Sequence, residues 1–222
     1  MLTLYIVRHG ETEWNQEGRI QGRLNSPLTE KGKRYAQLLG ERLRNVEFAE
    51  VITSPSERTL ETTEIILQGR DLLYQKDGTI MEMDMGPWQG LTKTEIVEKF
   101  PDDYDCFMLR PNLYQNEGAE TFIEMYKRAE NFLDTVKKRE VTGNLLVVSH
   151  GLFIKSLFLV IKGIPIKDFW TEPTVNGTSL SVVKIESAKM EIVFKGDMSH
   201  IKEKSDRSPN REHIRTEVVS KE

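Results

Sequence analysis

The sequence predicts an α/β fold with an open central sheet. Two apolar runs of strand length, residues 4–7 and 145–148, each lead into polar residues and a His-Gly pair. Buried strands that end in this way deliver polar side chains to the carboxyl edge of an α/β sheet, where such folds bind ligands. Segments with helical spacing of apolar residues lie between the two runs. We therefore expect His9 and His150 to face each other across one pocket.

Length and composition predict one domain with a substantial core. The chain has 222 residues, of which 38% are hydrophobic and 30% are charged. We expect a single domain over residues 1–222, with residues 69–118 as an inserted cap and residues 202–222 as a polar C-terminal tail. The formal net charge of −4 argues against a nucleic-acid partner, because binding phosphate backbones requires clustered positive charge. The sequence makes no prediction of oligomeric state.

Cysteine usage and hydropathy indicate a cytoplasmic protein without a membrane segment. Cys106 is the single cysteine, so an internal disulfide is excluded, and the N-terminus lacks the pattern of a secretion signal. The most apolar segment, residues 152–161, contains Lys155 and has about half the length of the roughly 20 residues that a membrane span needs. We expect this segment to be a buried helix.

The N-terminal half predicts alternating strands and helices. After the first strand, residues 13–26 have no periodicity and are expected to form a loop. Thr29 is a candidate N-cap for a helix whose apolar residues share one face. Residues 51–53 form a short strand, and residues 54–57 have the form of a capping box with Pro55 at the first helical position.

The C-terminal half predicts cap helices, a long helix and a sheet edge. Residues 92–100 and 103–109 are expected as short helices of the cap. Residues 122–136 keep the spacing of one long amphipathic helix, which leads into the second His-Gly strand. Residues 179–185 and 190–194 indicate two strands joined by a short polar turn, which we expect at an antiparallel edge of the sheet.

Two arginines and a histidine in this pattern are suited to phosphoryl chemistry. Hydrolysis of a phosphate monoester is very slow without a catalyst and requires a barrier reduction of roughly 20 kcal/mol or more. Arg8 and Arg58 each follow a strand, where planar guanidinium groups can bind phosphoryl oxygens and stay protonated. His9 is the candidate nucleophile, because an imidazole nitrogen can attack phosphorus and form a phosphohistidine that water then cleaves.

The second His-Gly strand and a separate carboxylate complete the candidate site. His150 can stabilise charge on the phosphoryl oxygens, and the backbone N–H groups of Gly151 and Leu152 begin a helix that favours an anion. The leaving alkoxide needs a proton from a carboxylic acid that apolar surroundings keep protonated. Glu82 lies among three methionines and a tryptophan in the sequence, and Asp84 is an equally good candidate on these grounds.

Metal-dependent and nucleotide-triphosphate chemistry lack sequence support. His200 and His213 have no partners at metal-ligand spacing, and the sequence has no Gly-x-x-x-x-Gly-Lys loop. We therefore expect neither a metal nor a cofactor, and a covalent mechanism that acts on a small-molecule phosphate monoester.

Taken together, these residues resemble the histidine phosphatase superfamily, which is also named for cofactor-dependent phosphoglycerate mutase. Four blocks carry the resemblance in chain order: residues 8–12 with Asn15, Gln21, Gly22, residues 26–29 and Gly32; Ser54 and Pro55 with Arg58 and Thr62; residues 82–86 with Trp88 and Gly90; and residues 147–151. The resemblance implies a three-layer αβα sandwich with a mostly parallel central sheet and a helical cap insertion. It also implies a phosphohistidine at His9 and makes Glu82, rather than Asp84, the proton donor.

The resemblance also implies the composition of the substrate site. Arg8, Arg58 and His150 would form the phosphate pocket. Further contacts to the substrate would come from Gly10, Glu11, Thr12, Asn15, Gln21, Gly22, Gly151 and Leu152.

Within the superfamily, residues 177–179 and 196–200 look most similar to bacterial broad-specificity phosphatases. Lys93 and the residues just before it are closer to the mutases. Met83 and Met85 stand where mutases place an arginine and a tyrosine, and we expect them to form an apolar wall for the substrate. We therefore expect a metal-independent phosphatase of broad specificity. The alternatives are a phosphoglycerate mutase and a non-catalytic phospho-ligand-binding protein.

Overall fold

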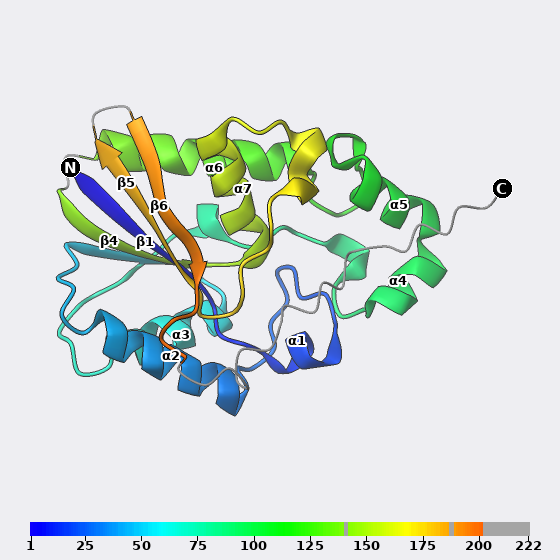
Figure 1. Ribbon diagram of the computed structural model, residues 1–222. Helices are drawn as coiled ribbons and strands as arrows, with labels where there is room; N and C mark the ends of the chain where they lie inside the picture. Colours follow the sequence, from blue (N-terminus) through cyan, green and yellow to red (C-terminus); the bar gives the residue numbers. More distant parts are fainter. Residues whose placement is uncertain (140–141, 187–188, 202–222) are drawn as a thin grey trace.

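A six-stranded sheet forms the centre of the protein, in the strand order β3-β2-β4-β1-β5-β6 (Figure 1). The computed structural model describes residues 1–139, 142–186 and 189–201, so the expected tail lies outside the described residues. The strands are β1 (Leu2–Arg8), β2 (Glu50–Thr53), β3 (Gln75–Lys76), β4 (Gly143–Ser149), β5 (Leu180–Glu186) and β6 (Lys189–Asp197). Strands β3, β2, β4 and β1 are parallel, β5 is antiparallel to β1, and β6 is antiparallel to β5.

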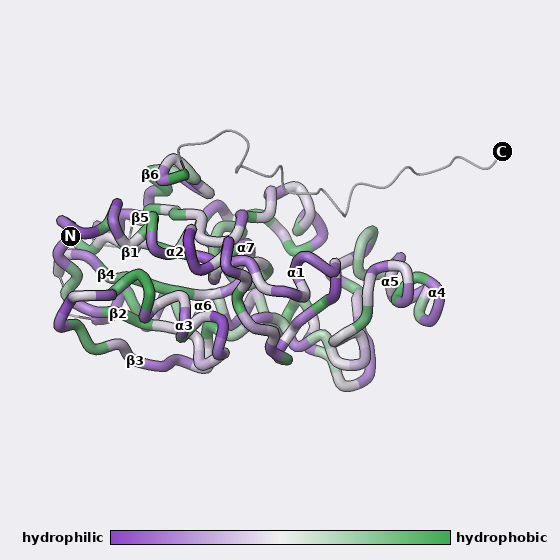
Figure 2. The backbone as a smooth tube through the Cα atoms, turned by 90° about the horizontal axis from the view of Figure 1, so that it is seen from below, coloured by the Kyte–Doolittle hydropathy of each residue, from purple (hydrophilic) through white to green (hydrophobic). Residues whose placement is uncertain are grey.

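Helices cover both faces of the sheet, which confirms the expected three-layer sandwich. Helices α2 (Glu30–Leu43) and α3 (Glu57–Leu67) pack on one face, and α6 (Phe122–Lys138) and α7 (Gly151–Lys162) pack on the other (Figure 1). The side chains of β4 alternate between the two layers, because successive residues of a strand point to opposite faces. Both faces are therefore apolar, and hydrophilic residues gather in surface elements such as α1 (Glu13–Glu17) and α4 (Lys93–Lys99) (Figure 2).

The pairing of β1 with β4 sets the position of the site. Strand β4 lies between β1 and β2 and pairs in parallel with both. Arg8 is opposite Ser149 in the β1–β4 register, and the His9 N–H donates to the Ser149 carbonyl at 3.0 Å. On the other side, the Ser54 N–H after β2 donates to the Val148 carbonyl at 3.0 Å. The ends of three strands therefore meet at one place.

Two local expectations differ from the structure. The expected loop after β1 contains the short helix α1, whose N-cap Thr12 forms a capping box with Asn15. A helix of five residues is too short to show apolar periodicity, which is why the sequence pattern missed it. The expected capping box at Ser54 is wrong, because α3 begins at Glu57 with Ser56 as its N-cap.

The segment 69–118 has two parts. Its first part adds β3 to the sheet and carries Glu82 between two short 3₁₀ helices, η1 (Gly78–Ile80) and η2 (Gly86–Trp88). Its second part contains α4, α5 (Pro101–Leu109) and η3 (Pro111–Leu113), which lie beyond the carboxyl edge of the sheet (Figure 1). The first part therefore belongs to the main layers, and the second part forms the cap.

A cluster of aromatic rings joins the cap to the main layers. The Phe107 ring centre lies 5.2 Å from that of Trp88, 4.9 Å from that of Phe122 and 5.2 Å from that of Trp170. The Trp170 indole, in the 3₁₀ helix η4 (Ile166–Thr171), also donates to the Phe107 carbonyl at 2.8 Å. Aromatic packing of this kind contributes beyond its buried area and holds α5 in place.

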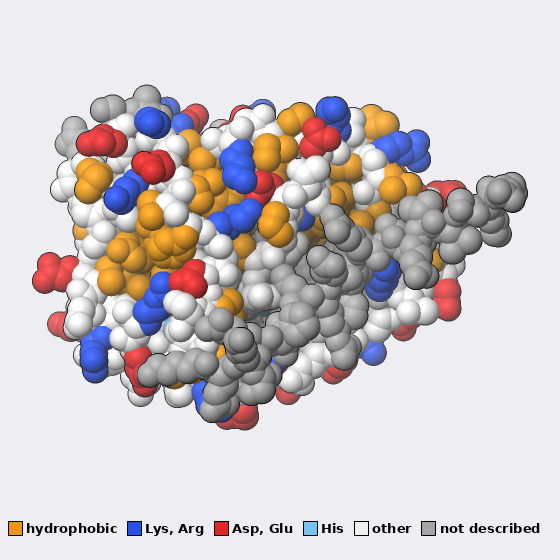
Figure 3. Space-filling view, viewed as in Figure 1, with side chains coloured by type: hydrophobic (Ala, Val, Ile, Leu, Met, Phe, Trp, Pro, Cys, Tyr) orange, Lys and Arg blue, Asp and Glu red, His pale blue; other side chains and the backbone are white. Residues whose placement is uncertain are grey.

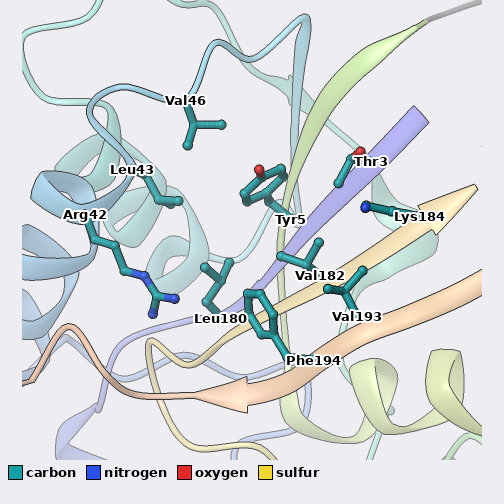
Figure 4. Close-up of a pocket in the computed structure, with 10 residues that line it drawn as sticks. All are labelled: Thr3, Tyr5, Arg42, Leu43, Val46, Leu180, Val182, Lys184, Val193 and Phe194. Atoms are coloured by element: carbon teal, nitrogen blue, oxygen red, sulfur yellow. The ribbon is translucent and has the colours of Figure 1, made fainter. Parts of the chain in front are cut away.

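A shallow groove of about 380 Å³ lies on the surface of β1, β5 and β6 beside α2. Hydrophobic side chains gather over this region in the space-filling view (Figure 3). The lining residues, shown in Figure 4, are Thr3, Tyr5, Arg42, Leu43, Val46, Leu180, Val182, Lys184, Val193 and Phe194. This set contains none of the residues expected to bind phosphate. In the part of the chain that the structure describes, no helix is long and apolar enough to cross a membrane.

The close approach of α2 to the loop after β1 gives a test of the fold. A Cβ atom on Gly32 would lie 2.3 Å from the Glu11 carbonyl oxygen, so Gly32→Ala must push backbone apart. We expect this substitution to lower the free energy of unfolding by about 1–3 kcal/mol, measured by urea denaturation. Gly78→Ala is the control, because a Cβ atom there meets open space. Equal stabilities of the two variants would contradict the packing described.

Candidate active site

The two His-Gly pairs meet at the carboxyl edge of the sheet, as expected from their positions after β1 and β4. The ring centres of His9 and His150 are 5.3 Å apart, and the rings are tilted by 58°. Both side chains are buried, with exposed fractions of 2% and 0%. Two imidazoles at this distance can form opposite walls of one small polar pocket.

The backbone around His9 fixes which of its nitrogens is free to react. His9 Nδ1 lies 2.7 Å from the carbonyl oxygen of Gly10. A carbonyl can only accept, so Nδ1 carries the proton and Nε2 keeps its lone pair. The Gly10 N–H donates to Thr62 Oγ1 at 2.9 Å, which anchors the turn to α3.

Thr178 holds the other side of the same turn. Its N–H donates to the carbonyls of Arg8 and His9, at 3.0 and 3.3 Å. Thr178 has a φ of 59°, which is an unfavourable backbone conformation for a β-branched residue. Strain at this point is tolerated because the buried contacts around His9 fix the backbone.

His150 connects the site to β2 and α3. Its Nδ1 lies 3.0 Å from Arg58 Nη2, and a guanidinium can only donate, so Nδ1 accepts. The proton is therefore on Nε2, which donates to Ser54 Oγ at 2.7 Å and lies 3.5 Å from Ser56 Oγ. Donation from His150 to a phosphoryl oxygen would require exchange of the Ser54 partner.

Arg8 and Arg58 bring two guanidinium groups to the pocket. Arg58 is 1% exposed and donates to the carbonyls of Gly22 and Leu24 at 2.8 and 2.7 Å. Arg8 Nη1 donates to the Val175 carbonyl at 2.7 Å. The Nε atoms of both arginines are buried and have no hydrogen-bond acceptor among the described residues. Two such donors are suited to the oxygens of an anion.

Glu82 lies at the start of α7 rather than in apolar surroundings. Its carboxylate accepts from the N–H groups of Met83, Leu152 and Phe153 at 3.0, 3.2 and 3.2 Å. A helix N-terminus stabilises a carboxylate in this way. Met83 and Met85, which we expected beside the substrate, are instead buried in the main hydrophobic core. The expectation of an apolar wall at these two methionines was therefore wrong.

Asp84 is turned toward η2 and away from this arrangement. Its Oδ1 accepts from the Gly86 N–H at 3.0 Å, and its Oδ2 lies 3.6 Å from Arg23. Burial lowers the pKa of Arg8 and of Arg58, and the negative charge of Glu82, rather than that of Asp84, opposes this shift in both.

Several residues expected to touch phosphate have protein partners instead. Glu11 accepts from Thr29 Oγ1 at 3.1 Å and pairs with Lys31 at 3.4 Å, which ties the loop to α2. The Thr12 N–H and hydroxyl both donate to Asn15 Oδ1 at 3.1 Å, within the capping box of α1. The Leu152 N–H is occupied by Glu82. These groups, like the Gly10 N–H, hold the loops in place in this structure.

The other three residues of that set lie next to the arginines. Gln21 is buried, and its Oε1 has no donor among the described residues. Gly22 has a φ of 54°, and a Cβ atom there would lie 2.4 Å from Gln89 Oε1, so only glycine fits. A Cβ atom on Gly151 would lie 3.4 Å from the Arg8 guanidinium carbon, which is an ordinary contact distance and shows that Arg8 lies against the start of α7.

Ser54, Ser56, Val175 and Thr178 contribute contacts that the sequence reasoning missed. Ser54 was interpreted as a candidate helix cap and as part of the second block of the resemblance, and Ser56 only as a member of the expected capping box. Val175 acts through its carbonyl and Thr178 through its N–H, which no side-chain pattern reports. The positions of Ser54 and Ser56 directly after a strand were the one available signal.

The electrostatics of the pocket favour neutral histidines and bound anions. Burial, followed by the charges of Arg58 and Arg8, holds the pKa of His9 well below its usual value of 6.5. Burial and Arg58 likewise hold the pKa of His150 well below 6.5. Burial lowers the pKa of Arg58 to about 10, so it stays protonated at neutral pH. A neutral imidazole next to two cations is suited to nucleophilic attack on an anionic phosphoryl group.

The fold and site together define an α/β protein in which two buried imidazoles and the unpaired Nε donors of two arginines meet at the carboxyl edge of the sheet. Residues 4–198 match the family described as "Histidine phosphatase superfamily (branch 1)". The match covers most of the chain, and the chain belongs to this superfamily.

Known relatives extend this result. The solved structure of Bacillus stearothermophilus YhfR is 38% identical, with a TM-score of 0.86 over 90% of this chain and 99% of that chain. The protein named Phosphoserine phosphatase 1 of Hydrogenobacter thermophilus is 32% identical over 91% of this chain and 96% of its own length. Probable phosphoglycerate mutase GpmB of Salmonella choleraesuis is 33% identical over 90% of this chain and 95% of its own length.

The lowered pKa values of the two histidines predict an acid-sensitive fold. In the unfolded chain both histidines bind protons below about pH 6.5, whereas in the folded chain they stay neutral. The free energy of unfolding should therefore fall as the pH drops from about 7.5 to about 5.5, by up to about 1.4 kcal/mol per pH unit for each histidine. Urea denaturation over this range measures the slope. The double variant His9→Asn, His150→Asn should lose this part of the slope, and an unchanged slope would contradict the prediction.

Proposed function

We propose that the protein is a phosphatase that hydrolyses small-molecule phosphate monoesters through a phosphohistidine at His9. The observation that carries this proposal is the Nδ1–H bond from His9 to the Gly10 carbonyl. That bond leaves a lone pair on Nε2 in a pocket with two buried arginine donors, Nε of Arg8 and Nε of Arg58. The relative named as a phosphoserine phosphatase supports the same reaction class.

The reaction proceeds in two balanced steps. First, Glu82 takes up a proton as the phosphate dianion binds beside it; His9 Nε2 then attacks phosphorus, the ester P–O bond breaks, and the leaving oxygen takes that proton from the Glu82 carboxyl group. Second, water attacks the phosphohistidine, Glu82 accepts a proton from that water, and inorganic phosphate leaves. Arg8 and Arg58 donate to the phosphoryl oxygens in both transition states, and His150 holds Arg58 in position through Nδ1.

The chain's own cations supply the positive charge that the reaction needs. Arg8 and Arg58 are fixed by carbonyl acceptors, so they need no rearrangement when charge develops on the phosphoryl group. We therefore propose a reaction that requires neither a metal nor another cofactor. The single cysteine supports a reducing cytoplasm as the proposed location.

We propose broad specificity, with the second part of the 69–118 segment as a cap over the substrate. A mutase must hold a small dianionic acid while it reorients, which needs several cations aimed at its carboxylate. Residues 91–118 contain a single arginine, Arg110, which is exposed. Lys93 lies 5.7 Å from the Tyr104 ring centre at the cap. The relative named as a probable phosphoglycerate mutase makes that activity the second candidate.

A phosphoenzyme at His9 is the first expected result. Mixing the protein with a ³²P-labelled monoester in the presence of EDTA, followed by an alkaline quench, should trap label on His9, because phosphohistidine survives alkali and is lost in acid. The His9→Ala variant should show neither label nor turnover. Label that survives acid on a serine, wild-type turnover of His9→Ala, or activity that requires an added divalent ion would each refute the mechanism.

Hydrolysis should also exceed isomerisation. We expect phosphate release from aryl and alkyl phosphates to be at least about 100-fold faster than conversion of 3-phosphoglycerate to 2-phosphoglycerate, which corresponds to about 2.7 kcal/mol of transition-state discrimination. Free phosphate and the two phosphoglycerates are measured in parallel, with bisphosphoglycerate present as primer. Efficient interconversion of the two phosphoglycerates with the primer present would show that the protein is a mutase and would overturn the proposal of a phosphatase with broad specificity.

A further inference from the structure

Side chains from outside the Glu82 loop fix the backbone that precedes Glu82. Residues 81–85, all described, lie in neither a helix nor a strand, so regular backbone pairing does not set their position. Arg128, on the second turn of α6, donates from Nη1 to the carbonyl of Thr79 at 2.6 Å and to that of Met81 at 3.0 Å. The residue directly before Glu82 is therefore bound to a guanidinium group.

Glu120 fixes the backbone that follows Glu82. Its carboxylate binds Arg128 through two parallel bonds, from Nε at 2.6 Å and from Nη2 at 2.8 Å. The same carboxylate accepts from the Asp84 N–H at 3.2 Å, and the Glu120 N–H donates to the Asp84 carbonyl at 2.8 Å. The Glu120 side chain is 8% exposed and that of Arg128 is 19% exposed, so solvent screens this pair weakly. One ion pair thus fixes the loop on both sides of Glu82.

Arg128 also contacts the helix that holds the Glu82 carboxylate. Its guanidinium carbon lies 5.1 Å from the ring centre of Phe153, in the first turn of α7. The N–H groups of Phe153 and Leu152 donate to the two carboxylate oxygens of Glu82. Arg128 is therefore in contact both with the chain that carries Glu82 and with the helix turn that orients its side chain.

We propose that Arg128 and Glu120 are positioning residues that hold Glu82 where it protonates the leaving oxygen. This inference rests on the acid role of Glu82 in the proposed function. A general acid works only within hydrogen-bond reach of the reacting oxygen, and a displacement of about 1 Å can cost about 100-fold in rate. A lysine at position 128 would keep the charge but could not reproduce the fork toward Glu120 and the two carbonyls together.

The test compares leaving groups in Arg128→Lys and Glu120→Gln. p-Nitrophenolate leaves without much protonation, whereas an alkoxide needs the acid. We expect kcat for an alkyl phosphate to fall at least about tenfold more than kcat for p-nitrophenyl phosphate in both variants, as in Glu82→Gln. Arg139→Met is the matched control. Arg139 ends the same helix and pairs with Glu50, with 26% of its side chain exposed, and we expect its loss to leave the ratio unchanged.

Amide hydrogen exchange of peptides that cover residues 79–85 gives a second readout that does not depend on catalysis. Exchange should become at least about tenfold faster in Arg128→Lys and Glu120→Gln, and should stay at the wild-type rate in Arg139→Met. If Arg128→Lys does not fold, Glu120→Gln alone decides. The positioning role would be overturned by the following combination of results. Glu82→Gln shows the leaving-group contrast, but Arg128→Lys and Glu120→Gln keep the wild-type ratio of the two kcat values or the wild-type rate of amide exchange. A Glu82→Gln variant without the contrast would instead refute the acid role in the proposed function, and exchange alone would then show whether the pair fixes the loop.

Discussion

The parallel pairing of β1 with β4 is the constraint on which the site depends. Both faces of β4 are apolar, so polarity alone does not select one register over another within the sheet. The polar residues at the two strand ends do select the register. Arg8 ends β1 and Ser149 ends β4, and the observed register places these two residues opposite each other. A slip of one residue would separate the His9 N–H from its acceptor on Ser149.

The two arginines contribute to the protonation state of both histidines of the site. Arg58 is almost fully buried, and its protein acceptors are neutral carbonyls and an imidazole, so its charge is only partly balanced by Glu82. Burial, followed by the positive charge of Arg58, disfavours protonation of His9 and His150 and lowers the pKa of both. A phosphoryl dianion would relieve both effects, because it supplies the missing negative charge. The charges that help burial to keep His9 unprotonated are therefore the same charges that would attract an anion.

The sequence predicted the long elements well and the fine structure of the site less well. Helices α2, α6 and α7 and strands β1 and β4 have strong apolar patterns, so their packing follows from periodicity. The misplaced methionines have a simple cause. In an extended segment successive side chains alternate, so Met83 and Met85 enter the core while Glu82 and Asp84 point the other way. Sequence neighbours of Glu82 are thus not its spatial neighbours.

Helix α3 contains residues of low helix propensity next to the site. Threonines have a low helix propensity, and α3 contains three that are buried: Thr59, Thr62 and Thr63. Their hydroxyls donate to backbone carbonyls, and Thr62 also accepts from the Gly10 N–H beside His9. Leucines at these positions would make a more stable isolated helix, but they would leave that N–H buried without an acceptor. One of the residues that disagree with local propensity, Thr62, therefore holds the turn beside His9, which is where a folded chain gives up local stability for the arrangement of a site.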